Sequence, residues 1–342
     1  MKHLKRLILF LVFMVSSGVL FASEADLKIP DLHEGHFPYF FNLSAWQLLF
    51  FGAWIIIGTL GISLSLRQKI KKLPAHKSML DIADTIYKTC RTYLIQQGKF
   101  LAILFGIVSV AIIFYLIMAH HAEAGQQNSI PLIVTIILVL FFSVIGIGGS
   151  YAVAWYGVRV NTYANARTAF ASLRKRPWDV VNIPLQAGIS IGLFLISLEL
   201  VMMVVILLFV PREIVGYCFL GFAIGESLGA SALRIAGGIF TKIADIGSDL
   251  MKIVFDVKED DPRNPGVIAD CTGDNAGDSI GPTADGFETY GVTGVALISF
   301  ITLAIADVHL QAKLIVWIFG MRFLMDIFSG ISYFINQAIS KK

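Results

Sequence analysis

Seven apolar stretches, separated by short polar segments, run along most of this chain. Stretches of about 18 or more apolar residues are long enough to cross a bilayer as α-helices. The composition agrees, because 56% of the residues are hydrophobic and only 15% are charged, whereas soluble domains carry about a quarter charged residues. The sequence therefore predicts an all-α polytopic membrane protein with the lipid bilayer as its partner. The expected spans are roughly 45–66, 100–119, 130–157, 183–210, 215–240, 278–306 and 314–338.

The first residues resemble a secretory signal sequence, which we place at 1–25. Lysines and an arginine open the chain, an apolar core follows over 7–20, and small residues such as Ala22 come next. An uncleaved first helix is the alternative interpretation. In either case the acidic segment 26–44 is expected outside the cell, ahead of a membrane domain over 45–342.

Basic residues indicate the orientation of the spans. They follow the first span and the third, and they end the chain: Arg67, Lys69, Lys71, Lys72 and Lys77; Arg159, Arg167, Arg174, Lys175 and Arg176; Lys341 and Lys342. By the positive-inside rule these sets share the cytoplasmic side only if the mature amino terminus is outside. We therefore expect a multi-pass protein of the cell membrane with the acidic segment 241–278 on the cytoplasmic face.

Several function classes lack their usual patterns. No basic patch with interleaved aromatic residues indicates a nucleic-acid partner. The three cysteines are far apart and show no CxxC spacing, so they predict neither a disulfide framework nor a zinc site. No GxxxxGK[ST] motif is present, which disfavours ATP as an energy source.

The acidic segment contains Asp270, Asp274 and Asp278 at four-residue intervals. On a helix this spacing aligns the three carboxylates along one face. Asn264 is a candidate cap for such a helix. Aligned carboxylates repel one another unless a divalent cation neutralises them, and oxygen-only ligands suit Mg²⁺ or Ca²⁺. Glycines at 273, 277 and 281 form a parallel stripe suited to close helix contact.

The span before this segment ends in a second phased group. Asp245 and Asp249 are four residues apart, with Lys242 three residues before Asp245 and Arg234 eight residues before Lys242. A helix leaving the membrane here would present Lys242 and both carboxylates to the cytoplasm. A lysine beside carboxylates and a metal favours a phosphate-bearing ligand.

Ionisable residues inside a membrane are costly and usually mark an ion path. Asp285 and Glu288 open the following span, and Arg234 is their expected partner by depth. Glu199 and Glu226 are further intramembrane acids, to which the sequence assigns no role. Two other interpretations of the acidic residues stay open: a solvated charged loop, and a passive Mg²⁺ or other cation transporter.

Three stretches resemble the membrane-bound, ion-translocating inorganic pyrophosphatases: AGGIFTKIADIGSDL at 236–250, EDDPRNPGVIADCTGDNAGD at 259–278 and TADGFETY at 283–290. Membership would imply hydrolysis of inorganic pyrophosphate coupled to Na⁺ or H⁺ transport. It implies Mg²⁺ as cofactor, K⁺ and Na⁺ as candidate activators, and a homodimer for the complete protein.

The resemblance also implies roles for individual residues. Lys242 would contact pyrophosphate, and Asp278 would deprotonate the attacking water besides contacting metal. The implied Mg²⁺ ligands are Asp245, Asp249, Glu259, Asp270, Asp274 and Asp278. Arg234, Asp285 and Glu288 would form the coupling funnel and ion gate. Glu288, three residues after the gate aspartate, favours Na⁺, although it could simply pair with Arg234.

Members of this family are about twice as long as this chain, and their second half completes the site. The resemblance therefore implies that the chain is an amino-terminal half that needs its missing carboxyl-terminal half. We expect no hydrolysis from this chain alone. A non-catalytic membrane subunit is the remaining alternative.

Overall fold

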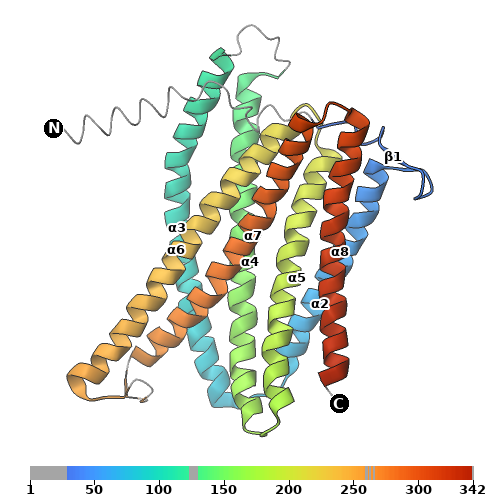
Figure 1. The fold of residues 1–342 in the computed structure, drawn as a ribbon. Coiled ribbons are helices and arrows are strands. Elements are labelled where there is room, and N and C mark those ends of the chain that lie inside the picture. Colours follow the sequence, from blue (N-terminus) through green and yellow to red (C-terminus); the bar gives the residue numbers. More distant parts are fainter. Residues whose placement is uncertain (1–28, 123–129, 259–260, 262, 265, 341–342) are drawn as a thin grey trace, which may run out of the picture.

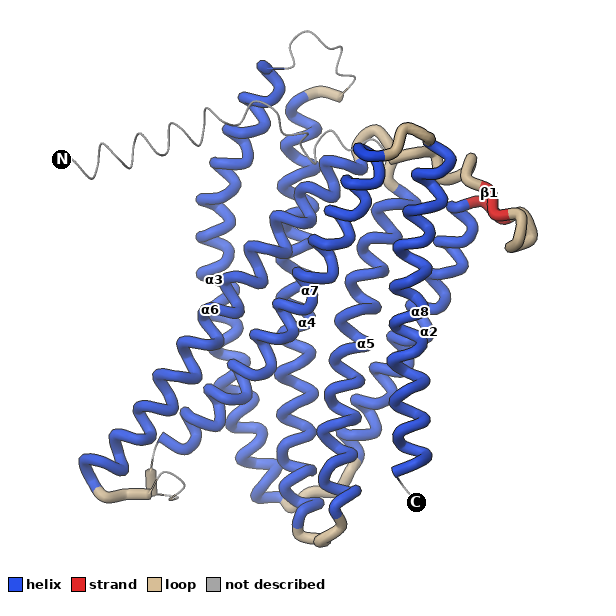
Figure 2. Tube along the Cα trace, in the orientation of Figure 1, coloured by secondary structure: helices blue, strands red, loops and turns tan. Residues whose placement is uncertain are grey.

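The computed structural model describes residues 29–122, 130–258, 261, 263–264 and 266–340 (Figure 1). The expected signal sequence and Glu259 lie outside these residues. Over the described ranges, seven helices are long and apolar enough to cross a membrane. Nearly all of the described secondary structure is α-helix (Figure 2). The prediction of an all-α polytopic membrane protein with seven spans after residue 44 is thus confirmed.

The helices are α2 (Ala45–Lys72), α3 (Lys77–Ala122), α4 (Leu132–Ser172), α5 (Pro177–Phe209), α6 (Val215–Phe255), α7 (Gly266–Ala304) and α8 (Val308–Ser340). Two short strands, β1 (His36–Phe37) and β2 (Leu43–Ser44), pair antiparallel just before α2. Local sequence explains several boundaries. Ser44 and Gln47 form a capping box at the start of α2. Pro177 occupies the first turn of α5, where its missing N–H costs nothing.

Several helices extend well beyond the predicted spans. Helix α3 begins at Lys77, well before the predicted span at 100–119. Helix α6 continues through the acidic segment to Phe255, and α7 begins at Gly266. Most of the polar stretch 241–277 is therefore helical, and only residues 256–265 connect the two helices. We call this unit, residues 234–288, the α6–α7 hairpin.

The hairpin leans outward from the other helices at the end that carries its connection (Figure 1). The 73–76 and 173–176 connections and the end of α8 lie at the same end of the bundle, whereas the strands and the connections 210–214 and 305–307 lie at the opposite end. The basic residues that flank the first and third spans thus share one end with the acidic connection. This arrangement is the one that the charge pattern predicts.

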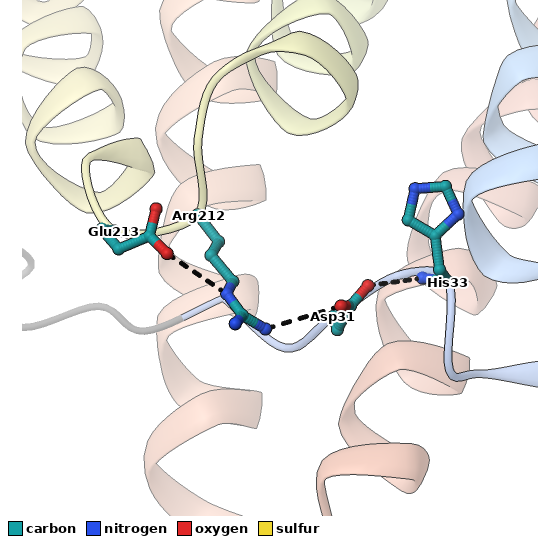
Figure 3. Close-up of polar contacts among 4 residues, drawn as sticks. All are labelled: Asp31, His33, Arg212 and Glu213. Carbon is teal, nitrogen blue, oxygen red and sulfur yellow. Dashed lines mark hydrogen bonds and ion pairs between the residues drawn. The ribbon is translucent and has the colours of Figure 1, made fainter.

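The amino-terminal segment is tied to the α5–α6 connection at the opposite end. Arg212 lies 3.5 Å from the Asp31 carboxylate and 3.3 Å from the Glu213 carboxylate (Figure 3). The backbone N–H of His33 donates to the same Asp31 side chain at 2.9 Å. These contacts fix residues 31–33 over the end of the bundle.

Helices α4 and α6 cross closely because glycines face the neighbouring backbone. A Cβ atom at Gly225 would overlap the carbonyl oxygen of Ser143, and one at Gly221 would overlap that of Val139. On the other helix, a Cβ at Gly146 would overlap the carbonyl oxygen of Phe222. This crossing anchors the first third of α6, so the acidic end of α6 is positioned relative to the bundle core.

Candidate functional site

The end of α6 presents one cation and two carboxylates. Lys242, Asp245 and Asp249 follow one another at helical spacing. The ammonium of Lys242 lies 3.5 Å from Oδ2 of Asp245, and the two side chains are 74% and 39% exposed. Such an exposed pair adds little stability. Both groups therefore remain available to a ligand from solution.

Helix α7 presents the second carboxylate group. Asp270, Asp274 and Asp278 lie within its first four turns, one turn apart, and the side chains of Asp274 and Asp278 are exposed. The helical phasing predicted from the sequence is present. Pro282 does not end the helix, which continues to Ala304.

Small residues on α7 let it approach α6. A Cβ at Gly273 would stand 3.0 Å from Cα of Thr241 and 3.0 Å from Cβ of Ala244. One at Gly277 would stand 3.1 Å from Cβ of Thr241. The expected glycine contact is therefore confirmed at these two positions. It is wrong for Gly281, because none of the described neighbours lies within 4 Å of the corresponding point.

The close approach allows a polar contact between the helices. The hydroxyl of Thr241 donates to Oδ1 of Asp274 at 3.0 Å. Thr241 directly precedes Lys242, so this bond fixes a carboxylate of α7 next to the lysine-bearing turn of α6. Sequence reasoning missed Thr241, although its position between the glycines of 237–238 and Lys242 is a visible signal.

A buried asparagine closes the hairpin. Asn264 is only 3% exposed, and its Nδ2 donates to the carbonyl and hydroxyl oxygens of Ser248 at 3.2 and 3.3 Å. Its Oδ1 accepts from the N–H of Gly266 at 2.8 Å. The predicted cap of α7 is thus confirmed, and the same side chain holds the end of α6 against the start of α7.

The connection itself holds a tight ion pair. Arg263 donates through Nε and Nη2 to the two carboxylate oxygens of Asp261, at 2.9 and 2.7 Å. These hydrogen bonds lower the pKa of Asp261 to about 2. Asp261 therefore stays ionised at any physiological pH, and both of its carboxylate oxygens are paired with Arg263.

Asp278 lies beside a cavity of about 760 Å³ between α4, α5 and α7. Polar lining groups include Asn161, Asn165 and Ser279, and Asn161 donates to the hydroxyl of Ser279 at 2.5 Å. The carboxylate of Asp278 therefore borders a volume large enough for water and a small polar ligand.

A charged cluster lies further along the same two helices. The guanidinium of Arg234 on α6 forms an ion pair with the carboxylate of Asp285 and lies 4.0 Å from Oε2 of Glu288, both on α7. The expectation that Arg234 is the partner of these acids is confirmed. Glu288 thus lies next to Arg234, as in the alternative interpretation in which it simply pairs with that arginine.

The structure does not gather all predicted ligands at one point. Among the described residues, no group of three or more His, Cys, Asp or Glu side chains is close enough to hold a metal ion. The donor set still fits Mg²⁺, because the available groups are carboxylate oxygens on facing helices. Mg²⁺ commonly binds one or two protein carboxylates and completes its shell with phosphate and water.

Sequence reasoning also missed a buried polar group on α8. Arg322 and Asp326 are four residues apart and are 7% and 0% exposed. Two ionisable residues one turn apart inside the apolar stretch 314–338 were the available signal.

Comparisons with known proteins match the sequence to one family. The family model described as "Inorganic H+ pyrophosphatase" matches residues 57–342. A protein of Chlorobaculum tepidum named "K(+)-insensitive pyrophosphate-energized proton pump" is 61% identical over 274 residues, which are 80% of this chain and 35% of the relative.

More distant relatives carry similar names. A protein of Pyrobaculum aerophilum with the same name is 32% identical over 287 residues, covering 81% of this chain and 37% of that protein. A "Putative K(+)-stimulated pyrophosphate-energized sodium pump" of Bacteroides thetaiotaomicron is 32% identical over 239 residues, covering 66% and 30%. The chain thus spans about a third of the length of the curated relatives it matches.

Proposed function

The chain belongs to the inorganic H+ pyrophosphatase family, and on that premise we propose that it supplies part of a magnesium-pyrophosphate site and part of the ion path of a pyrophosphate-energised pump. The observation that carries the proposal is the α6–α7 hairpin. It brings a lysine and carboxylates of two helices to one end of the bundle. The same two helices hold the Arg234 cluster further along.

The hairpin offers complementary groups for a magnesium-bound pyrophosphate. Lys242 supplies a mobile, exposed ammonium for phosphate oxygens. Asp245 and Asp249 on α6, with Asp270 and Asp274 on α7, would hold Mg²⁺; Glu259, outside the described residues, is the further proposed ligand. Bound Mg²⁺ would neutralise phosphate charge and polarise phosphorus. The Thr241 hydrogen bond keeps one Asp274 oxygen directed towards α6.

Asp278 is the proposed base for direct attack by water on phosphorus. An exposed carboxylate beside a cavity that has several polar groups in its lining can hold a water molecule and accept its proton. The neighbouring amides of Asn161 and Asn165 add groups that can orient water in the same volume.

Hydrolysis can be coupled to ion transport because the substrate-binding residues and the Arg234 cluster lie on the same two helices, α6 and α7. Lys242 is eight residues beyond Arg234 on α6, a rise of about 12 Å. A substrate that draws the cytoplasmic end of α6 towards α7 also shifts Arg234 relative to Asp285 and Glu288. We propose that this change in pairing opens or closes the gate for the transported ion.

The relatives support H⁺ as that ion. The protein that is 61% identical is named a proton pump, and the sodium pump is 32% identical. We therefore propose H⁺ rather than the Na⁺ that the position of Glu288 favours by itself. The charge pattern supports a cytoplasmic location for the hairpin in a cell membrane. Homodimerisation and activation by K⁺ or Na⁺ remain expectations, and the proton-pump relatives are named K⁺-insensitive.

Binding of pyrophosphate by the full chain in lipid nanodiscs tests the proposal. Calorimetric titration should show binding that requires Mg²⁺ and that is lost in Lys242→Met. Lys252→Met is the matched control, because Lys252 is also exposed and lies on the last turns of α6. Binding should persist in this control.

Other outcomes would favour the rival functions. Mg²⁺ binding that is indifferent to pyrophosphate would indicate a passive cation transporter. No binding of either ligand would indicate a non-catalytic subunit. Robust Mg²⁺-dependent phosphate release from this chain alone would contradict the proposal that the site is only partial.

A further inference from the structure

Two glutamates meet in the interior of the bundle, away from the hairpin site. Glu199 of α5 and Glu226 of α6 are both 0% exposed. Among the described residues, none of their four carboxyl oxygens has a hydrogen-bond donor. Gly291 of α7 leaves the space that they share: a Cβ there would overlap Oε2 of Glu226 and stand 2.6 Å from Oε1 of Glu199. The two carboxyl groups are therefore adjacent, because one oxygen of each lies within 2.6 Å of this same point.

Arg322 is the cation whose charge acts on both glutamates, but its direct contacts are with neutral groups. Arg322 of α8 donates to Thr293 at 3.3 Å, and its guanidinium stacks 4.4 Å from the centre of the Tyr290 ring. It contacts the sulfur of Met203 at 3.6 Å. Its charge acts on both glutamates only at longer range.

Other charged groups near the pair are acids. Glu288 of α7 is close enough for its charge to act on Glu226, and the charges of Asp326 of α8 and of Glu199 both act on Tyr290. Helix α4 places Gly146 and Ser150 next to Glu226, and the Ser150 hydroxyl donates to the Glu226 carbonyl at 3.4 Å. The surroundings thus contain more negative than positive groups.

This excess of negative groups around the pair requires one of its two carboxyl groups to be neutral. Two adjacent carboxylates in a buried site repel each other and lose their hydration. A charge in the middle of a membrane is expensive even when single. One proton held between the pair removes one charge and gives the facing oxygens a hydrogen bond, while the guanidinium balances the other charge. A metal cation would instead stand near the guanidinium and be repelled by it.

We propose that Glu199 and Glu226 form a carboxyl pair that holds one shared proton inside the membrane. The O–H of one glutamate donates to a carboxylate oxygen of the other. Transfer to Glu288 would break the O–H bond at Glu226 and form one on the Glu288 carboxylate. The role of the pair as a station on the ion path rests on the proposed pump function, whereas the shared proton does not.

Infrared spectroscopy of the full chain in lipid nanodiscs tests the shared proton. At neutral pH the chain should show the carbonyl-stretching band of a protonated carboxylic acid in water-free surroundings. The band should be lost in Glu199→Gln and in Glu226→Gln, because a single carboxyl beside the amide and Arg322 can ionise. Glu213→Gln is the matched control, since Glu213 is exposed at the α5–α6 connection, and it should keep the band.

Labelling with an apolar carbodiimide gives a second readout that needs no variant. The reagent reacts with protonated carboxyl groups in the membrane, and peptide mass analysis should locate the adduct at Glu199 or Glu226. This readout decides the matter if the glutamine variants do not fold. Absence of an adduct at both residues would overturn the proposal.

Further outcomes separate this inference from the proposed function. A band that persists in both variants would overturn the shared proton, and so would a band absent from the unmodified chain. Loss of the band on adding Na⁺, but not choline, would assign the site to sodium and overturn it too. Failure of the chain to bind magnesium-pyrophosphate while the band is present would refute the pump proposal alone.

Discussion

Replacement of Gly225 by alanine should destabilise the protein because α4 and α6 touch backbone to backbone there. The added Cβ would overlap the carbonyl oxygen of Ser143 and stand 2.7 Å from its carbonyl carbon and 2.8 Å from its Cα. Backbone atoms cannot rotate away as a flexible side chain can. The two helices must therefore separate or tilt around the new methyl group.

The expected loss in the free energy of unfolding is the packing cost of the added methyl group minus the gain in helix propensity. Forcing an extra carbon into a packed interface costs about 1–3 kcal/mol, and the backbone contact places Gly225→Ala at the upper end. Alanine in place of glycine within a helix gains about 1 kcal/mol. The net loss should be about 2 kcal/mol, or roughly a 30-fold change in the folding equilibrium.

Reversible unfolding in mixed detergent micelles, followed by circular dichroism, measures this loss. Gly61→Ala on α2 is the matched control, because no neighbour in the described part of the chain lies within 4 Å of the Cβ that it would add. This control should be neutral or stabilising by up to about 1 kcal/mol, the gain in helix propensity. Equal unfolding free energies for the two variants would refute the close crossing of α4 and α6.

Three further predictions concern the hairpin. Thr241→Val keeps the shape but removes the hydrogen bond to Asp274, so Mg²⁺ affinity in the pyrophosphate titration should fall about tenfold; Thr241→Ser should restore it, and an unchanged affinity in the valine variant would contradict the proposed role. Asn264→Ala removes the cap of α7 and should cost about 1 kcal/mol; amide hydrogen exchange in the first turn of α7 should accelerate, and unchanged protection would count against the cap. The Asp261 carboxyl should titrate by NMR near pH 2, and Arg263→Ala should return its pKa towards 3.8. Because the pKa is lower in the folded state, the ion pair stabilises the connection above about pH 4, and this stabilisation is lost as the pH falls towards 2. A titration midpoint that the substitution leaves unchanged would argue against the ion pair.

Much of the fold could be predicted because the deciding signals are local. A bilayer-length apolar run requires a helix, since backbone groups in lipid must be satisfied within the segment. Over the residues that the structure describes, seven such runs form seven helices long enough to span the membrane. The four-residue intervals of Asp270, Asp274 and Asp278 gave one helix face without knowledge of any neighbour.

Helix boundaries in the polar segment were less predictable. Helix α6 continues fifteen residues beyond the predicted end of its span at residue 240, to Phe255. Hydropathy detects only the part of a helix that lipid covers, so it cannot predict how far a helix continues into water. Packing against α7, including the Asn264–Ser248 contacts, supports this extension.

The sequence by itself determined the class of the protein, the phasing of its carboxylates and the family to which it belongs, because composition, periodicity and motifs are properties of contiguous residues. Only the tertiary structure decided which turns meet. The Thr241–Asp274 hydrogen bond depends on the register of α6 against α7, and the facing of Glu199 and Glu226 depends on the space at Gly291. Such contacts join residues far apart in the chain, and their geometry is set by how closely glycines let helices pack.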